Sequence, residues 1–350
     1  MELITVKDLS FFYPEQTIPA LDNLSFLIPS GAFVVLCGPS GCGKSTLLRQ
    51  LKPAMAPHGR RSGEIWFDGV SLERLDARTQ ARCIGFVQQS TENQIVTDKV
   101  WHELAFGLES LGYDTHSIRR RVAEIAAFFG MEAWFHKSVT ELSGGQKQLL
   151  NLASVMVLQP DLLILDEPTS QLDPIAASEF LAALIKINRE LGTTILLTEH
   201  RLEDVVPLAS ELIVMERGRL LCSGTAQEVG LQLKRLDHPM FLAMPSPMRI
   251  WAAVETAQPC PVTVQEGRQW LTDFARTHQL KPLPAEIERT FSSGPVIQVS
   301  EAWFRYERGG TDVIKGLSME VKRGEFLALL VILPISQKSA KIRPSVVKTK

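Results

Sequence analysis

A glycine-rich loop at residues 38–45 constrains the fold of this chain more than any other feature. It reads Gly-Pro-Ser-Gly-Cys-Gly-Lys-Ser; an apolar run at residues 33–36 precedes it, and Thr46-Leu47-Leu48 follows it. The run predicts a buried strand, and we expect Thr46 and the leucines to open a helix. This order places backbone N–H groups and the positive end of a helix dipole around a phosphate. A chance glycine turn is the alternative, and the flanking strand and helix disfavour it.

The loop supplies most of the predicted nucleotide-binding residues. The Lys44 ammonium is expected to reach the β- and γ-phosphates, and the Ser45 hydroxyl to bind Mg²⁺. Cys42 lies just ahead of the helix, where a thiolate is favoured, so we expect its alkylation to block ATP hydrolysis. The alternative for Cys42 is a small residue that merely fits. The predicted set in and beside the loop is Gly38, Pro39, Ser40, Gly41, Cys42, Gly43, Lys44, Ser45 and Thr46.

Two acidic residues end a second apolar run, at residues 162–165. In a parallel sheet such a run forms a buried strand, and the acid emerges at the carboxyl-terminal edge, where ligands bind. Asp166 is therefore the candidate that organises Mg²⁺, and Glu167 the candidate that polarises an attacking water. Taken alone, the pair also fits a helix-capping role, because acids stabilise helix N-termini.

A short segment between the loop and the acids, Leu142-Ser-Gly-Gly-Gln146, identifies a family. A serine and two glycines at a helix start expose backbone N–H groups to a phosphate, and a loop turn is the alternative. With this segment the sequence resembles the ATP-binding cassette (ABC) ATPases over about residues 1–228. The supporting segments appear in family order: the phosphate loop, Gln89, residues 142–146, Asp166-Glu167, residues 170–173 and His200.

The resemblance implies two cassettes that pair face to face and enclose two ATP molecules. Each ATP would lie between the phosphate loop of one subunit and Ser143, Gly144, Gly145 and Gln146 of the other. Asp173 would contact the opposing subunit near the loop.

The resemblance also assigns roles around the γ-phosphate. Gln89 would sense Mg²⁺ and the water, and His200 would hold the γ-phosphate, although a lone histidine is usually a surface residue. Tyr13 would stack on adenine; a core tyrosine at a strand end is the alternative. The catalytic candidates are thus Glu167, His200 and Gln89, and the metal candidates are Ser45, Gln89 and Asp166.

Alternating strands and helices predict an α/β phosphate-loop NTPase fold with a mainly parallel sheet. An antiparallel β part is expected at the N-terminus, and a helical subdomain is expected as an insertion at about residues 98–158. The predicted ATP-binding domain spans residues 1–230. Recurrent prolines indicate a linker or small subdomain over residues 231–295.

The chain then repeats its own beginning. Residues 297–306 echo residues 4–13, and residues 323–330 echo residues 30–37, but no second phosphate loop follows. We expect residues 296–330 to start a truncated second cassette and residues 331–350 to be a basic tail. A natural tail or an expression boundary is the alternative. A chain of this kind would homodimerise, pair with another ATPase subunit, or be inactive.

Several details resemble the energy-coupling factor (ECF) importers of vitamins, and the tandem layout resembles their thiamine-precursor type. These include residues 91–94, the helical block after Gln89, and residues 199–203. The partners implied are a transmembrane scaffold subunit and a substrate-binding membrane subunit. A groove near residues 89–112 would grip the scaffold; its candidate lining residues, which also fit core positions of a helix, are Trp101, Leu104, Phe106 and Leu108.

Composition limits where the chain is expected to act and which partners it is expected to bind. The chain has 37 basic and 39 acidic residues, a net charge of −2 that gives no reason to expect nucleic acid. The five cysteines form no CxxC pair, which fits a reducing cytoplasm. No signal peptide or membrane span is expected, so the predicted location is cytoplasmic, peripheral on the inner face of the cell membrane. The rival reading is a soluble cassette ATPase acting on ribosomes or DNA.

Overall fold

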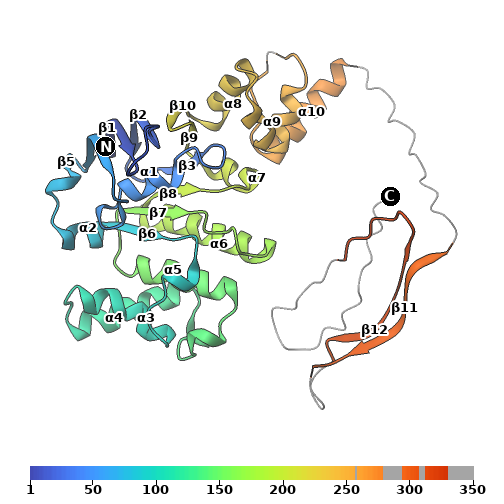
Figure 1. The fold of residues 1–350 in the computed structure, drawn as a ribbon, viewed down its shortest axis with the longest axis horizontal. Coiled ribbons are helices and arrows are strands. Elements are labelled where there is room, and N and C mark those ends of the chain that lie inside the picture. The colour runs from blue at the N-terminus through green and yellow to red at the C-terminus, as the bar shows by residue number, and fades with distance from the viewer. Residues whose placement is uncertain (257, 279–293, 307–311, 330–350) are drawn as a thin grey trace. The chain divides into compact units, whose positions relative to one another are not determined.

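The computed structural model describes residues 1–256, 258–278, 294–306 and 312–329, drawn as ribbon in Figure 1. The chain divides into two compact units, Met1–His278 and Gln279–Lys350. The expected basic tail, residues 331–350, lies outside the described residues. The predicted domain boundaries stay predictions.

A six-stranded sheet in the order β10-β9-β3-β8-β7-β6 forms the centre of the first unit. β9 is parallel to β3, and β3, β8, β7 and β6 are parallel to one another; only β10 is antiparallel. All residues of β3, β6, β7 and β8 are buried, which explains their continuous apolar runs. The strands are β3 (Phe33–Cys37), β6 (Ile84–Val87), β7 (Leu162–Asp166), β8 (Thr194–Thr198), β9 (Glu211–Glu216) and β10 (Arg219–Gly224).

Strands from the N-terminal part of the chain form a second sheet, in the order β2-β1-β4-β5. All its strand pairs are antiparallel. Its strands alternate buried and exposed residues more clearly, as expected where one face is solvated. The predicted fold class, a mainly parallel core with an antiparallel N-terminal part, is confirmed. The strands are β1 (Glu2–Phe12), β2 (Leu21–Pro29), β4 (Arg60–Phe67) and β5 (Val70–Ser71).

Two groups of helices lie at opposite ends of the first unit, and further helices lie beside the strands between them (Figure 1). The predicted insertion contains α3 (Val100–Ser110), α4 (Thr115–Phe128) and α5 (Gly144–Met156), grouped at one end. At the other end lie α8 (Ala226–Arg235), α9 (Ser246–Ala252) and α10 (Val264–Thr277). The remaining helices are α1 (Lys44–Gln50), α2 (Ala77–Cys83), α6 (Pro174–Lys186) and α7 (Leu202–Val205). Of the helices that the structure describes, none is long and apolar enough to cross a membrane.

The described part of the expected linker is largely helical. Met248 and Trp251 of α9 and Trp270 of α10 are buried in the same apolar cluster as the central sheet. Burial of these large side chains ties α9 and α10 to the first unit. The helices α8, α9 and α10 therefore form a small helical layer on this unit.

The second unit contains a hairpin of β11 (Pro295–Phe304) and β12 (Ile314–Lys322) that repeats the β1–β2 pair. Ile297 faces Val321, as Ile4 faces Ile28 in the first unit. Val299 faces Met319, as Val6 faces Phe26. The repeat inferred from the sequence thus extends to strand pairing.

The two hairpins also share an irregularity. Asp8 and Glu301 hold corresponding places and both adopt a left-handed backbone, with φ of 48° and 45°. The backbone N–H of each donates 2.9 Å to a serine hydroxyl on the facing strand, Ser25 or Ser318. A bulge at this point is therefore common to both copies.

Candidate nucleotide site

The phosphate loop connects β3 to α1 and needs glycine where the backbone approaches other segments. Gly38 has a φ of 153°, and a Cβ there would lie 2.2 Å from the Met215 carbonyl oxygen. Gly43 has a φ of 105°, and its Cβ would lie 2.5 Å from the Ala20 carbonyl oxygen. Any side chain at these positions would displace the loop.

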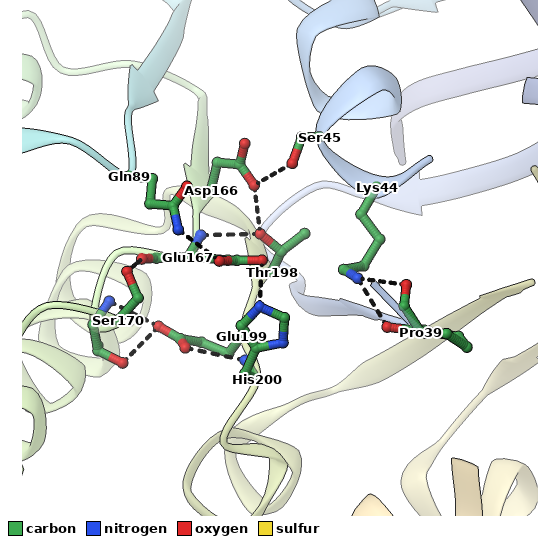
Figure 2. A network of polar contacts seen from close by, with 12 residues as sticks. Pro39, Lys44, Ser45, Gln89, Asp166, Glu167, Ser170, Thr198, Glu199 and His200 are labelled. Atoms are coloured by element: carbon green, nitrogen blue, oxygen red, sulfur yellow. Dashed lines mark hydrogen bonds and ion pairs between the residues drawn. The ribbon is translucent and has the colours of Figure 1, made fainter. Parts of the chain in front are cut away.

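Lys44 folds back over this loop in Figure 2. Its ammonium donates to the carbonyl oxygens of Gly38 at 2.8 Å and Pro39 at 3.1 Å. These contacts satisfy the charge of a buried side chain with neutral acceptors. A phosphate entering the loop would offer the ammonium a stronger, charged partner.

Ser45 and Asp166 meet at the mouth of the loop, as the sequence predicts for two metal candidates. The Ser45 hydroxyl donates to Asp166 Oδ1 at 3.0 Å, and the Thr198 hydroxyl donates to the same oxygen at 3.0 Å (Figure 2). Thr198 is placed there because β7 and β8 pair Asp166 with Thr198. The group presents hydroxyl and carboxylate oxygens, which are the ligands that Mg²⁺ prefers.

Gln89, Glu167 and His200 come from three separate segments and meet at one carboxylate (Figure 2). Gln89 Nε2 donates to Glu167 Oε2 at 2.8 Å, and His200 Nε2 lies 2.7 Å from Glu167 Oε1. Glu167 turns away from β7 with a φ of 49°, a strained conformation for a residue with a side chain. The structure therefore brings all three catalytic candidates together.

Tyr13 lies beside the start of α1. Its hydroxyl lies 2.9 Å from the Thr46 hydroxyl, and its ring packs edgewise on Phe11 with centroids 5.0 Å apart. The ring remains 36% exposed. Tyr13 thus borders the phosphate loop and offers a surface to solvent.

Ser143 is the N-cap residue of α5. Its hydroxyl accepts from the Gln146 N–H at 3.3 Å, and Gln146 Oε1 accepts from the Ser143 N–H at 3.0 Å. A Cβ on Gly144 would meet no atom within 4 Å, whereas one on Gly145 would lie 2.9 Å from Ala176 Cβ. Within the described residues, no hydrogen bond of this cap reaches the phosphate loop.

Burial bears on two of the expectations. Cys42 is buried, and this burial raises the pKa of its thiol; nearby Lys44 lowers it by less. Burial therefore opposes the thiolate that the helix end would favour, and the effect of alkylating Cys42 on hydrolysis stays a prediction. In the expected groove, Leu104 and Leu108 are fully buried in the core, because they lie on the inner face of α3, while Trp101 and Phe106 are 42% and 39% exposed.

Asp173 caps α6, accepting from the N–H groups of Ile175 and Ala176 at 2.9 and 3.0 Å. Its contact with an opposing subunit stays a prediction. No role in the site was predicted from the sequence for Thr198, Glu199, Thr169 or Gln148. One signal in the sequence could have identified two of them: Thr198 and Glu199 are polar residues at and directly after the end of the apolar strand β8.

The comparisons agree with this geometry. A family model described as "ABC transporter" matches residues 21–170. Among solved structures, cbiO1 from Clostridium perfringens, described as part of the ABC transporter complex cbiONQ, is 30% identical with a TM-score of 0.61. The match covers 71% of this chain and 98% of cbiO1. This chain belongs to the ABC transporter ATPase family.

Curated relatives of this ABC chain are longer than it is. A putative ABC transporter ATP-binding protein of Bacillus thuringiensis is 40% identical over 93% of this chain and 58% of the relative. The energy-coupling factor transporter ATP-binding protein EcfA2 of Methanospirillum hungatei is 36% identical over 69% of this chain and 61% of the relative. The ABC chain thus spans about three fifths of the length of these curated proteins.

Proposed function

We propose that this chain binds ATP and hydrolyses its γ-phosphate as the ATP-binding subunit of a membrane importer. The observation that carries the proposal is the convergence of Gln89 and His200 on Glu167, beside the Ser45–Asp166 pair. A carboxylate held by two polar side chains next to a phosphate loop is suited to orient and deprotonate a water.

Each side chain has a distinct task. Lys44 would exchange the carbonyls of Gly38 and Pro39 for the β- and γ-phosphates. Ser45, Asp166 and Gln89 offer oxygen atoms that fit Mg²⁺, which when bound neutralises phosphate charge. His200 would turn from Glu167 to the γ-phosphate, leaving the Glu167 carboxylate free to accept the proton of the water.

We propose further that the site is completed by a second cassette, either another copy of this chain or another ATPase subunit. The cap formed by Ser143 and Gln146 exposes the Gly144 side of its loop. Pairing two cassettes face to face would bring this loop to the partner's phosphate loop, as the family resemblance implies. Nucleotide would then act as part of the interface.

The proposed physiological role is import of a vitamin, such as a thiamine precursor, in an ECF-type system. The likeness to EcfA2 and to the cbiONQ subunit supports this class. The scaffold and substrate-binding membrane subunits would place the chain on the cytoplasmic face of the cell membrane. Exposed Trp101 and Phe106 on α3 offer an apolar contact for such a scaffold.

The decisive test is light scattering on Glu167→Gln with and without Mg-ATP. This change keeps the ATP-binding loop and slows hydrolysis, so a closed pair should accumulate. We expect a nucleotide-dependent shift from monomer to dimer, and none for Lys44→Ala, which lacks the phosphate-binding ammonium. A Glu167→Gln chain that binds ATP but stays monomeric would contradict pairing between copies and favour a different partner cassette.

A further inference from the structure

We propose that Glu199 is a positioning residue that sets how Glu167 and His200 face each other. The proposal rests on the hydrolytic function argued above. It concerns a buried carboxylate that none of the nucleotide-binding, metal or catalytic assignments uses. Glu199 follows β8 directly and precedes His200 in the chain.

Glu199 joins two segments of the site (Figure 2). Its Oε1 accepts from the Thr169 N–H at 2.9 Å and from the Thr169 hydroxyl at 2.7 Å. Its Oε2 accepts from the backbone N–H of His200 at 3.3 Å. One carboxylate thus holds both Thr169, two places after Glu167, and His200, whose side chain contacts Glu167.

These contacts close a ring. The backbone runs from Glu167 to Thr169, the Glu199 carboxylate connects Thr169 to His200, and the His200 imidazole returns to Glu167 Oε1 at 2.7 Å. In such a ring, a change at one hydrogen bond alters the relative position of the other members. Removing the Glu199 carboxylate therefore takes away the link between the His200 N–H and Thr169, while the Glu167 N–H remains bonded to Thr198.

The burial of Glu199 argues that this arrangement has a purpose. The residue is 4% exposed, and burial raises the pKa of its carboxyl, while hydrogen bonds from Thr169 and His200 lower it. A buried carboxylate costs free energy that an apolar residue of the same size would avoid. Its hydrogen bonds to Thr169 and to the His200 N–H are the contacts that suit a geometric role.

Two variants separate position from binding. In Glu199→Ala the acceptor is lost, and we expect kcat to fall about 10- to 100-fold, since misplacement by about 1 Å has effects of that size. The Kd for ATP should stay within about twofold, because the phosphate loop is untouched. Glu199→Gln keeps an oxygen for Thr169, so its loss of kcat should be smaller.

Glu211→Gln is the matched control. Glu211 begins β9, and burial raises the pKa of its carboxyl as well. The substitution removes a carboxylate charge from the same unit without touching the ring, so kcat should not change. Equal loss of kcat in Glu211→Gln and Glu199→Gln would overturn the proposal.

A second readout does not depend on hydrolysis. The imidazole ¹⁵N resonances of His200, assigned with His200→Asn, report its contact with Glu167 in the nucleotide-free full chain. We expect Glu199→Ala to move them toward their values in Glu167→Gln, where the carboxylate partner is lost. Unmoved resonances would overturn the positioning role, and so would moved resonances with unchanged hydrolysis. If the resonances move but the unsubstituted chain does not hydrolyse ATP, the result refutes the proposed function instead.

Discussion

Cys42 shows how burial overrides a local sequence rule. Its position before α1 favours a thiolate, yet its side chain is 5% exposed and burial raises the pKa of the thiol. A thiol reacts through its thiolate, so both the ionised fraction and the access of a reagent are reduced.

We therefore expect Cys42 to react slowly with iodoacetamide at pH 7.5 in the folded chain. The rate should rise on unfolding in urea, where the pKa returns toward its ordinary value. Peptide mass spectrometry at timed intervals measures the labelled fraction. Modification of Cys42 as fast as that of free cysteine would contradict the buried geometry.

Motifs predict the residues of the site better than their connections. Ser45, Asp166, Glu167 and His200 were identifiable because each has a characteristic neighbourhood in sequence. The contacts of Glu199 were not, because they arise from the parallel pairing of β7 with β8, which no local pattern specifies. Likewise, the periodic pattern of α3 did not show which of its apolar residues lie at the surface, and only the structure did.

At the scale of elements, α5 carries a buried polar face that joins two loops of the site. The Thr91 hydroxyl donates to Gln148 Oε1 at 2.7 Å, and Gln148 Nε2 donates to the Pro168 carbonyl at 2.9 Å. Asn151, on the next turn, donates to the Thr91 carbonyl at 3.2 Å. The helix that begins at Ser143 is thus fixed to the segments after Gln89 and Glu167.

Gln148→Leu should lower the free energy of unfolding by about 1–3 kcal/mol, because it leaves buried polar partners unsatisfied. Thr91→Val removes the facing hydroxyl, and the double variant should cost less than the sum of the single ones. Urea unfolding of all four forms measures this coupling. Strict additivity would show that the two side chains act independently.

The element boundaries were partly predictable. The apolar runs located β3, β7 and β8, since fully buried strands are continuous in sequence. The helical block at residues 98–158 was expected, but its polar interior was not, because Gln148 and Asn151 occupy positions where periodicity predicts apolar side chains.

At the scale of the whole molecule, the two hairpins have the same pairing and different surroundings. Ile4 and Phe11 are buried at 0% and 1% exposure, whereas Ile297 and Phe304, at matching places, are 52% and 47% exposed. In the first unit the hairpin covers an apolar cluster that includes β4 and α1. The sequence repeat predicted a second copy of this region, and the structure shows its strand pairing and the exposure of its apolar side chains.

Ile297→Lys should therefore leave the unfolding midpoint of the first unit unchanged and reduce self-association of the full chain, because it replaces exposed apolar surface by charge. Ile4→Lys is the matched substitution and should prevent folding of the first unit, since it buries an unpaired charge. Light scattering and circular dichroism measure the two effects. Similar loss of folded protein in both variants would contradict the exposure of Ile297.

The cap at Ser143 has a consequence for the proposed pairing of two cassettes. Its hydroxyl oxygen accepts the Gln146 N–H, which leaves the hydroxyl hydrogen free to donate elsewhere without breaking the cap. An anion arriving at this helix end meets donors that folding has already ordered. The conformational entropy of this loop is therefore already lost when the chain folds, and ordering it does not weaken the proposed pairing with a second cassette.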